Sequence, residues 1–128
     1  MDVTPLIKSD RQVIQSYSNG RFRVSGHVYE SAIFVAPDRT YIWGFSGNIQ
    51  NIDIEDFAPL FEDAAEIDVV LLGCGSEMEF ITPSFKQKLK DKGLVIEVMD
   101  TGAACRTFNV LMAEGRRVVA ALLPDHKV

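Results

Sequence analysis

Residues 67–75 read IDVVLLGCG, and residues 94–123 read LVIEVMDTGAACRTFNVLMAEGRRVVAALL. Ile67–Leu72 is an almost uninterrupted apolar run rich in β-branched residues, a pattern typical of a strand buried on both faces in a parallel sheet. Leu94–Met99 and Val118–Leu123 have the same character. The two stretches therefore predict three buried strands, and the segments between them must supply the helices that cover the sheet.

Helical signals connect these strands. Thr82 is expected to be an N-cap with Pro83 at the first helical position, which predicts a helix over 83–92 that ends at a glycine. Thr101 is expected to cap a second helix whose apolar side carries Phe108 and which also ends at a glycine. The carboxy-terminal half should therefore form a β-α-β-α-β unit with parallel strands.

The amino-terminal half has a different pattern, β-type alternation interrupted by turns. Asn19-Gly20 indicates one turn and residues 36–39 a second, with β-rich segments between them and after them. This pattern predicts an amino-terminal antiparallel β layer. A short helix is expected within residues 54–65, with Pro59 delaying its regular part.

Composition limits the class of protein. The chain has 128 residues, of which 47% are hydrophobic, so a single α/β domain over residues 1–128 is expected. A net charge of −5 disfavours nucleic acid and anionic membrane surfaces as partners. The amino terminus lacks the apolar run of a secretory signal, and no segment approaches the roughly 20 apolar residues that cross a bilayer. These features predict a soluble, cytoplasmic protein that is not embedded in a membrane.

Two cysteines, Cys74 and Cys105, occur without the spacing of a zinc site or a redox pair. His27 and His126 are far apart in the sequence, so neither a metal nor a cofactor is expected. Buried, unreactive thiols are the favoured interpretation of the cysteines. The alternative is a reactive thiol activated by the amino terminus of the second helix.

In open α/β sheets a ligand crevice forms beyond the carboxyl ends of the strands. Here those ends are Gly73-Cys74-Gly75 and the segment from Glu97 to Thr101. Glycines let backbone amides approach a ligand closely, and a helix amino terminus favours an anion. The alternative is that the glycines only end a strand and that Thr101 only caps a helix.

Glu97 interrupts an apolar strand, which is costly unless its carboxylate is exposed or paired. Arg106, Arg116 and Arg117 are candidate partners, and an ion pair is favoured over general acid or base catalysis. No catalytic residue is assigned.

The carboxy-terminal half resembles a small family of unknown function. Its pattern is E-x-M-x-T-x-A-A-x-x-T-x-N-x-L-x-x-E-x-R over residues 97–116, preceded by VVLLGCG at 69–75. Weaker agreement includes G-x-F-x-V-x-G at 20–26 and Trp43-Gly44. The family includes a mitochondrial respiratory complex I assembly factor, an adipogenesis-associated vertebrate protein, and short bacterial and archaeal proteins.

This resemblance implies a compact α/β fold and no established reaction. It points to a shared pocket formed by Gly73, Gly75, Thr101, Thr107 and Asn109. Two hypotheses follow for the function. The first is a non-enzymatic interaction or assembly-factor-like protein with a protein partner, acting on a membrane-associated complex or as a homo-oligomer. The alternative is a small-molecule or anion-binding protein, or an uncharacterised enzyme, that uses the crevice at the ends of strands 67–72 and 94–99.

Overall fold

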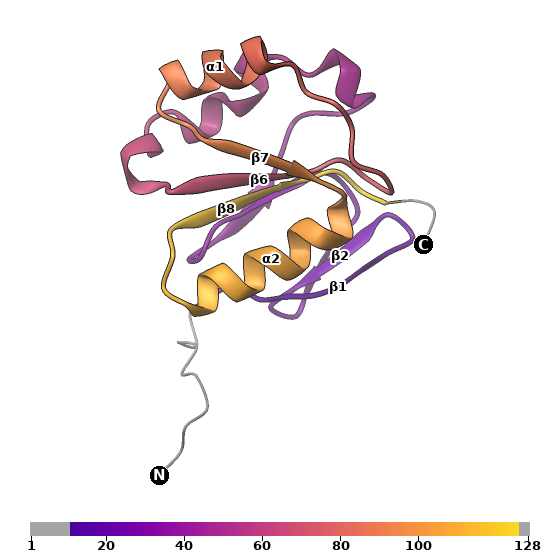
Figure 1. The fold of residues 1–128 in the computed structure, drawn as a ribbon. Coiled ribbons are helices and arrows are strands. Elements are labelled where there is room, and N and C mark those ends of the chain that lie inside the picture. The colour runs from indigo at the N-terminus through magenta and orange to yellow at the C-terminus, as the bar shows by residue number, and fades with distance from the viewer. Residues whose placement is uncertain (1–10, 126–128) are drawn as a thin grey trace.

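The computed structural model describes residues 11–125, so the first ten residues and His126 lie outside the described part. Two sheets and two α-helices form three layers (Figure 1). A three-stranded antiparallel sheet has the order β1-β2-β3, and a five-stranded mixed sheet has the order β5-β4-β8-β6-β7. The strands are β1 Ile14–Ser18, β2 Arg21–Val24, β3 His27–Tyr29, β4 Ile33–Val35, β5 Thr40–Ile42, β6 Val69–Gly73, β7 Ile96–Met99 and β8 Val118–Leu122.

The parallel core predicted from the apolar runs is confirmed. β6 lies between β7 and β8 and pairs in parallel with both of them. All five residues of β8 are buried, which explains why its sequence lacks a polar alternation.

The amino-terminal strands are antiparallel, as predicted, but they divide between the two sheets. β4 and β5 form a hairpin, and β4 pairs antiparallel with β8, so this hairpin extends the main sheet. Only β1, β2 and β3 form a separate layer.

Each face of the main sheet is covered by its own set of elements. On one face lie α1 (Pro83–Asp91) and three 3-10 helices, η1 Ile49–Asn51, η2 Ile54–Leu60 and η3 Ala64–Glu66. On the other lie α2 (Thr101–Ala113) and the three-stranded sheet (Figure 1). Trp43 and Phe57 belong to the first core, and Phe22 and Phe108 belong to the second.

Local signals explain where the helices begin. Thr82 caps α1 by accepting a hydrogen bond from the amide of Phe85, as predicted. The helix expected within 54–65 is instead the 3-10 helix η2, followed by η3. Asp53 caps η2 and Pro59 lies inside it, and a residue without an amide hydrogen suits a short 3-10 segment better than an α-helix.

Candidate functional site

An open cavity of about 400 Å³ lies where the carboxyl ends of β6 and β8 meet. Its walls come from these ends, from the residues before β4 and from the segment leading into η1. Its lining includes Ser31, Phe45, Asn48, Ile49, Cys74 and Leu123. The cavity lies at the same edge of the sheet as the predicted crevice, but of the residues predicted to form that crevice only Cys74 lines it, and the 45–49 segment takes the place of β7 and α2 in its walls.

Thr101, the first residue of α2, is fully buried and attaches the start of this helix to the same edge of the sheet. Its hydroxyl donates a hydrogen bond of 2.6 Å to the carbonyl of Leu123 and accepts one of 2.8 Å from the amide of Gly75. The prediction that Thr101 caps α2 is wrong, because the Asp100 side chain accepts the capping bond from the Ala103 amide. The Thr101 hydroxyl instead joins α2 to the two strand ends.

Two glycines permit this closure. A Cβ atom on Gly73 would lie 3.0 Å from the Cα atom of Thr101, and one on Gly102 would lie 2.8 Å from the hydroxyl oxygen of Tyr17. Any side chain at Gly73 would therefore push α2 away from β6. We call Gly73, Gly75, Thr101 and Gly102 the α2 junction.

The Asn109 side chain is hydrogen-bonded to the three-stranded sheet. Its side-chain oxygen accepts a hydrogen bond of 2.9 Å from the Ile14 amide, and its nitrogen donates one of 2.8 Å to the Ile14 carbonyl. This reciprocal pair attaches β1 to α2. Thr107 is half-buried on the same helix and does not line the cavity.

Glu97 lies away from the cavity, on the exposed part of β7. It lines a separate groove with α1 residues, including Lys86 and Lys90. None of the three arginines considered as its partners forms an ion pair with it among the described residues: Arg117 pairs with Asp68 at 2.8 Å, and Arg106 donates to the Tyr17 hydroxyl at 2.6 Å. Cys74, Glu97 and Asn109 thus do not share one cavity.

The thiols differ in exposure but not in the direction of their pKa. Burial raises the pKa of Cys105 to about 12, and burial also raises the pKa of the half-buried Cys74. Both shifts disfavour the thiolate, which is the reactive form of cysteine. This environment agrees with the interpretation of both residues as unreactive thiols.

Sequence reasoning missed the most exposed apolar side chains beside the cavity. Residues 76–81, which we call the rim loop, follow β6 and carry Met78 and Phe80 with 66% and 73% of their surface exposed. Glu79 between them lines the cavity and accepts a hydrogen bond of 3.3 Å from Gln50. The signal was the placement of two large apolar residues among polar ones in a segment between a strand and a helix.

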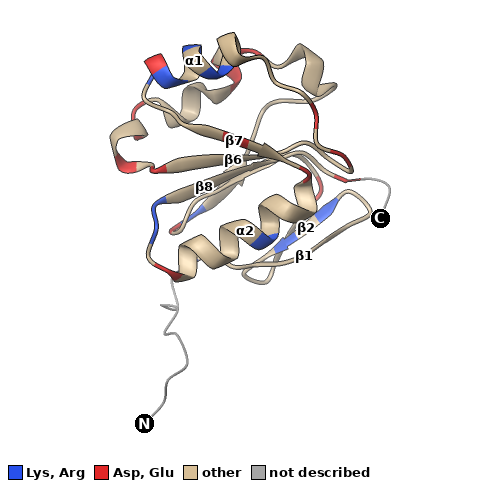
Figure 2. Ribbon diagram, viewed as in Figure 1, with Lys and Arg blue, Asp and Glu red and all other residues tan. Residues whose placement is uncertain are grey.

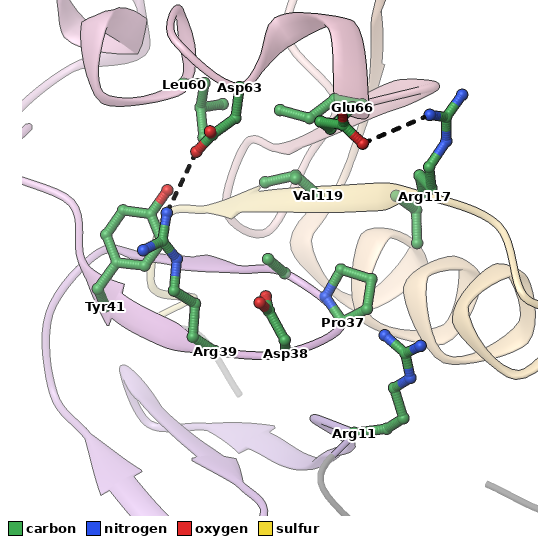
Figure 3. A pocket seen from close by; sticks show the side chains of 13 residues that line it. Arg11, Pro37, Asp38, Arg39, Tyr41, Leu60, Asp63, Glu66, Arg117 and Val119 are labelled. Atoms are coloured by element: carbon green, nitrogen blue, oxygen red, sulfur yellow. Dashed lines mark hydrogen bonds and ion pairs between the residues drawn. The ribbon is translucent and has the colours of Figure 1, made fainter. Parts of the chain in front are cut away.

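A second hollow, of about 490 Å³, lies at the opposite end of the sheet (Figure 3). Arg39 and Asp63 form an ion pair of 3.3 Å across it, and Arg117 approaches Glu66 at 3.8 Å. Arg117 also holds the pKa of Asp68 below its ordinary value by hydrogen bonding. These charges mainly satisfy one another, so this hollow is a weaker candidate for a ligand site than the cavity beside Cys74.

Two further features of the described residues concern metals and membranes. Among residues 11–125, no three His, Cys, Asp or Glu side chains are grouped so that they could hold a metal ion. None of the helices formed by these residues has the length and apolarity needed to cross a membrane.

Comparison with known proteins identifies relatives over nearly the whole chain. The mouse protein named NADH dehydrogenase [ubiquinone] 1 alpha subcomplex assembly factor 3 is 34% identical over 111 residues, which are 87% of this chain and 60% of that protein. The chain thus spans less than two thirds of this relative.

Two solved structures are also similar. A crystal structure of a Bordetella parapertussis protein has a TM-score of 0.80 and 35% identity and covers 90% of this chain and 97% of its own. A Bartonella henselae structure described as an outer membrane protein also has a TM-score of 0.80 and 33% identity. The match covers 91% of this chain and 98% of that one. The family model described as "Protein of unknown function (DUF498/DUF598)" matches residues 14–123, and the chain therefore belongs to this family.

Proposed function

We propose that this chain is a non-enzymatic binding module that assists the assembly of a larger, membrane-associated protein complex. The observation that supports this proposal most directly is the 34% identity with the mouse assembly factor over 87% of this chain. The partner by analogy is a subunit of a respiratory NADH dehydrogenase.

The rim loop offers a contact surface for such a partner. Methionine and aromatic side chains are enriched at protein interfaces, where they supply apolar area and adapt to the partner's shape. Met78 and Phe80 are the two most exposed large apolar residues in the described part of the chain. The loop that carries them is anchored at one end by the α2 junction and in its middle by the Glu79–Gln50 hydrogen bond. A positioned loop loses less conformational entropy on binding than a free one.

The cytoplasm is the proposed location, supported by two thiols that are not paired with each other. Cell fractionation with an antibody against the native protein tests this part of the proposal. Recovery with the soluble cytoplasmic fraction and with the inner face of the membrane is expected. Recovery with the outer membrane, as the description of the Bartonella relative suggests for that protein, would contradict it.

Crosslinking and affinity capture from cells that naturally produce the protein test the binding role. The wild type should enrich a reproducible subunit of a membrane complex, and Met78→Asp combined with Phe80→Asp should lose it. Val110→Asp is the matched control, because Val110 is 57% exposed on α2 and does not line the cavity. Equal capture by all three proteins would remove the rim loop from the proposal.

The cavity beside Cys74 supports a second candidate, the binding of a small polar molecule. Its volume of about 400 Å³ is in the range of small-ligand sites. Ser31, Asn48 and Cys74 supply polar groups to its lining. A thermal-shift screen with a metabolite panel tests this function, since a ligand at 100 times its Kd stabilises a fold by about 2.7 kcal/mol. Asn48→Ala should abolish any shift, whereas an unchanged shift would place the ligand elsewhere.

A further inference from the structure

β7 is an edge strand of the main sheet, and its outer side is open. It pairs only with β6 among the described strands. The carbonyls of Val95 and Met99 accept hydrogen bonds from β6 and the residue that follows it. Because backbone groups along a strand alternate in direction, the amide and carbonyl groups of Ile96 and Val98 point to the open side. An extended segment could pair with these groups as an additional strand.

A groove of about 310 Å³ runs along this edge, between β7 and α1. Lys86 and Lys90 line its α1 side, and Val95, which is 46% exposed, lines its β7 side together with the exposed carboxylate of Glu97. Neither lysine forms an ion pair with any other residue of the 11–125 segment. In Figure 2 the α1 ribbon, which is blue at its lysines, lies above β7. The groove therefore combines unpaired backbone groups with two unpaired lysines and a single carboxylate, a local excess of positive charge in a chain whose net charge is −5.

We infer that the β7 edge and Lys86 and Lys90 of α1 together bind an extended acidic segment of a partner protein as an added β-strand. The spacing supports this pairing. Residues four apart on a helix are separated by about 6 Å along its axis. Alternate residues of a strand are separated by about 6.6 Å and lie on one face. Two acidic residues at alternate positions of the added strand therefore match the two lysines, while the backbone pairs with Ile96 and Val98.

A second copy of this chain fits the edge less well than an acidic segment. If two β7 strands paired antiparallel about a twofold axis, both α1 helices would lie on the same face. Their lysines would then approach one another, and like charges in apposition weaken an interface. Addition of a peptide strand to a sheet edge gains affinity from the main chain and specificity from alternating side chains. Here the specificity would come from acidic residues.

This inference rests on the proposed role in partner binding but uses a different surface from the rim loop. The rim-loop proposal and the β7-edge inference can therefore be disproved independently of each other. Loss of capture in the Met78 and Phe80 variants tests the rim loop, whereas the amide resonances of Ile96 and Val98 in the presence of a peptide test the β7 edge.

The test is an NMR titration of the ¹⁵N-labelled full chain with a short capped peptide in which valine alternates with glutamate. The amide resonances of Ile96 and Val98 should shift, and their hydrogen exchange should slow, because their outward amides gain acceptors. The affinity should fall as the salt concentration rises, since the lysine contacts are exposed. The same peptide with lysine in place of glutamate should bind much more weakly.

Two charge-reversal variants locate the contact. Lys86→Glu combined with Lys90→Glu should weaken binding roughly tenfold or more, because two attractive pairs become repulsive. Lys88→Glu combined with Lys92→Glu changes the net charge equally and should have a much smaller effect, because neither residue lines the groove. Equal effects of the two variants, or no shift at Ile96 and Val98 with millimolar glutamate peptide, would overturn the inference. Protection of these amides that depends on protein concentration without peptide would assign the edge to a second copy and would also overturn it.

Discussion

The end of β6 and the rim loop follow one another in the chain but have opposite surroundings. Gly73 and Gly75 are buried in the α2 junction. There the Thr101 hydroxyl accepts a hydrogen bond from the Gly75 amide, after β6, and donates one to the Leu123 carbonyl, after β8. Met78 and Phe80 are largely exposed only a few residues later. The difference teaches that residues carrying the strongest family pattern specify the architecture. The most exposed large apolar side chains of the described residues lie beside them, in residues outside that pattern.

Truncation of a buried phenylalanine on α2 and of the exposed phenylalanine in the rim loop should give the largest contrast in stability. Phe108 is fully buried beneath α2, so Phe108→Ala should lower the free energy of unfolding by about 3–5 kcal/mol. Phe80→Ala should change it by less than about 0.5 kcal/mol, because the ring is mostly in solvent. Urea denaturation followed by circular dichroism measures both values. Similar losses would mean that the rim loop is part of the core.

Removal of a single hydroxyl should have a smaller effect. Thr101→Val leaves the Leu123 carbonyl and the Gly75 amide buried without this partner and should cost about 2 kcal/mol. Thr107→Val on the same helix is the control and should stay within about 0.5 kcal/mol. If both variants unfold at the same urea concentration, the Thr101 hydroxyl is not what closes the α2 junction.

Thiol reactivity should distinguish Cys105, buried on α2, from Cys74, at the end of β6, without changing stability. With a pKa of about 12, only about one Cys105 thiol in 10,000 is ionised near pH 8. Cys105 should therefore react with a disulfide reagent only when the protein unfolds, and Cys74, on the cavity wall, should react slowly in the native state. Timed labelling followed by mass spectrometry distinguishes the two sites. Fast labelling of Cys105 in native protein would contradict its burial.

Local sequence signals predicted much of the fold. The apolar character of Ile67–Leu72 reports burial on both faces, and that alone points to the centre of a parallel sheet. Thr82-Pro83 marked the start of α1 because capping depends on neighbouring residues only. The division of the amino-terminal strands was not predictable in this way, because the pairing of β4 with β8 joins segments far apart in the chain.

The same limit applies to the candidate site. Asp100 and Thr101 are adjacent, and both are residue types that cap helices, so sequence did not decide between them. The decision comes from Leu123, whose carbonyl is brought to the Thr101 hydroxyl by the parallel sheet. Likewise, Asn109 resembled a pocket residue until its hydrogen bonds to Ile14, 95 positions away, placed it between α2 and β1.

Site-specific photocrosslinking tests the central claim, that partner contact is made by the rim loop, most directly. A photoreactive phenylalanine analogue replaces Phe80 in one protein and Val110 in another, since both side chains are more than half exposed. Irradiation in living cells should join the analogue at position 80, and not the one at 110, to a subunit of a membrane-associated complex. A partner captured equally at both positions, or only at position 110, would contradict the claim.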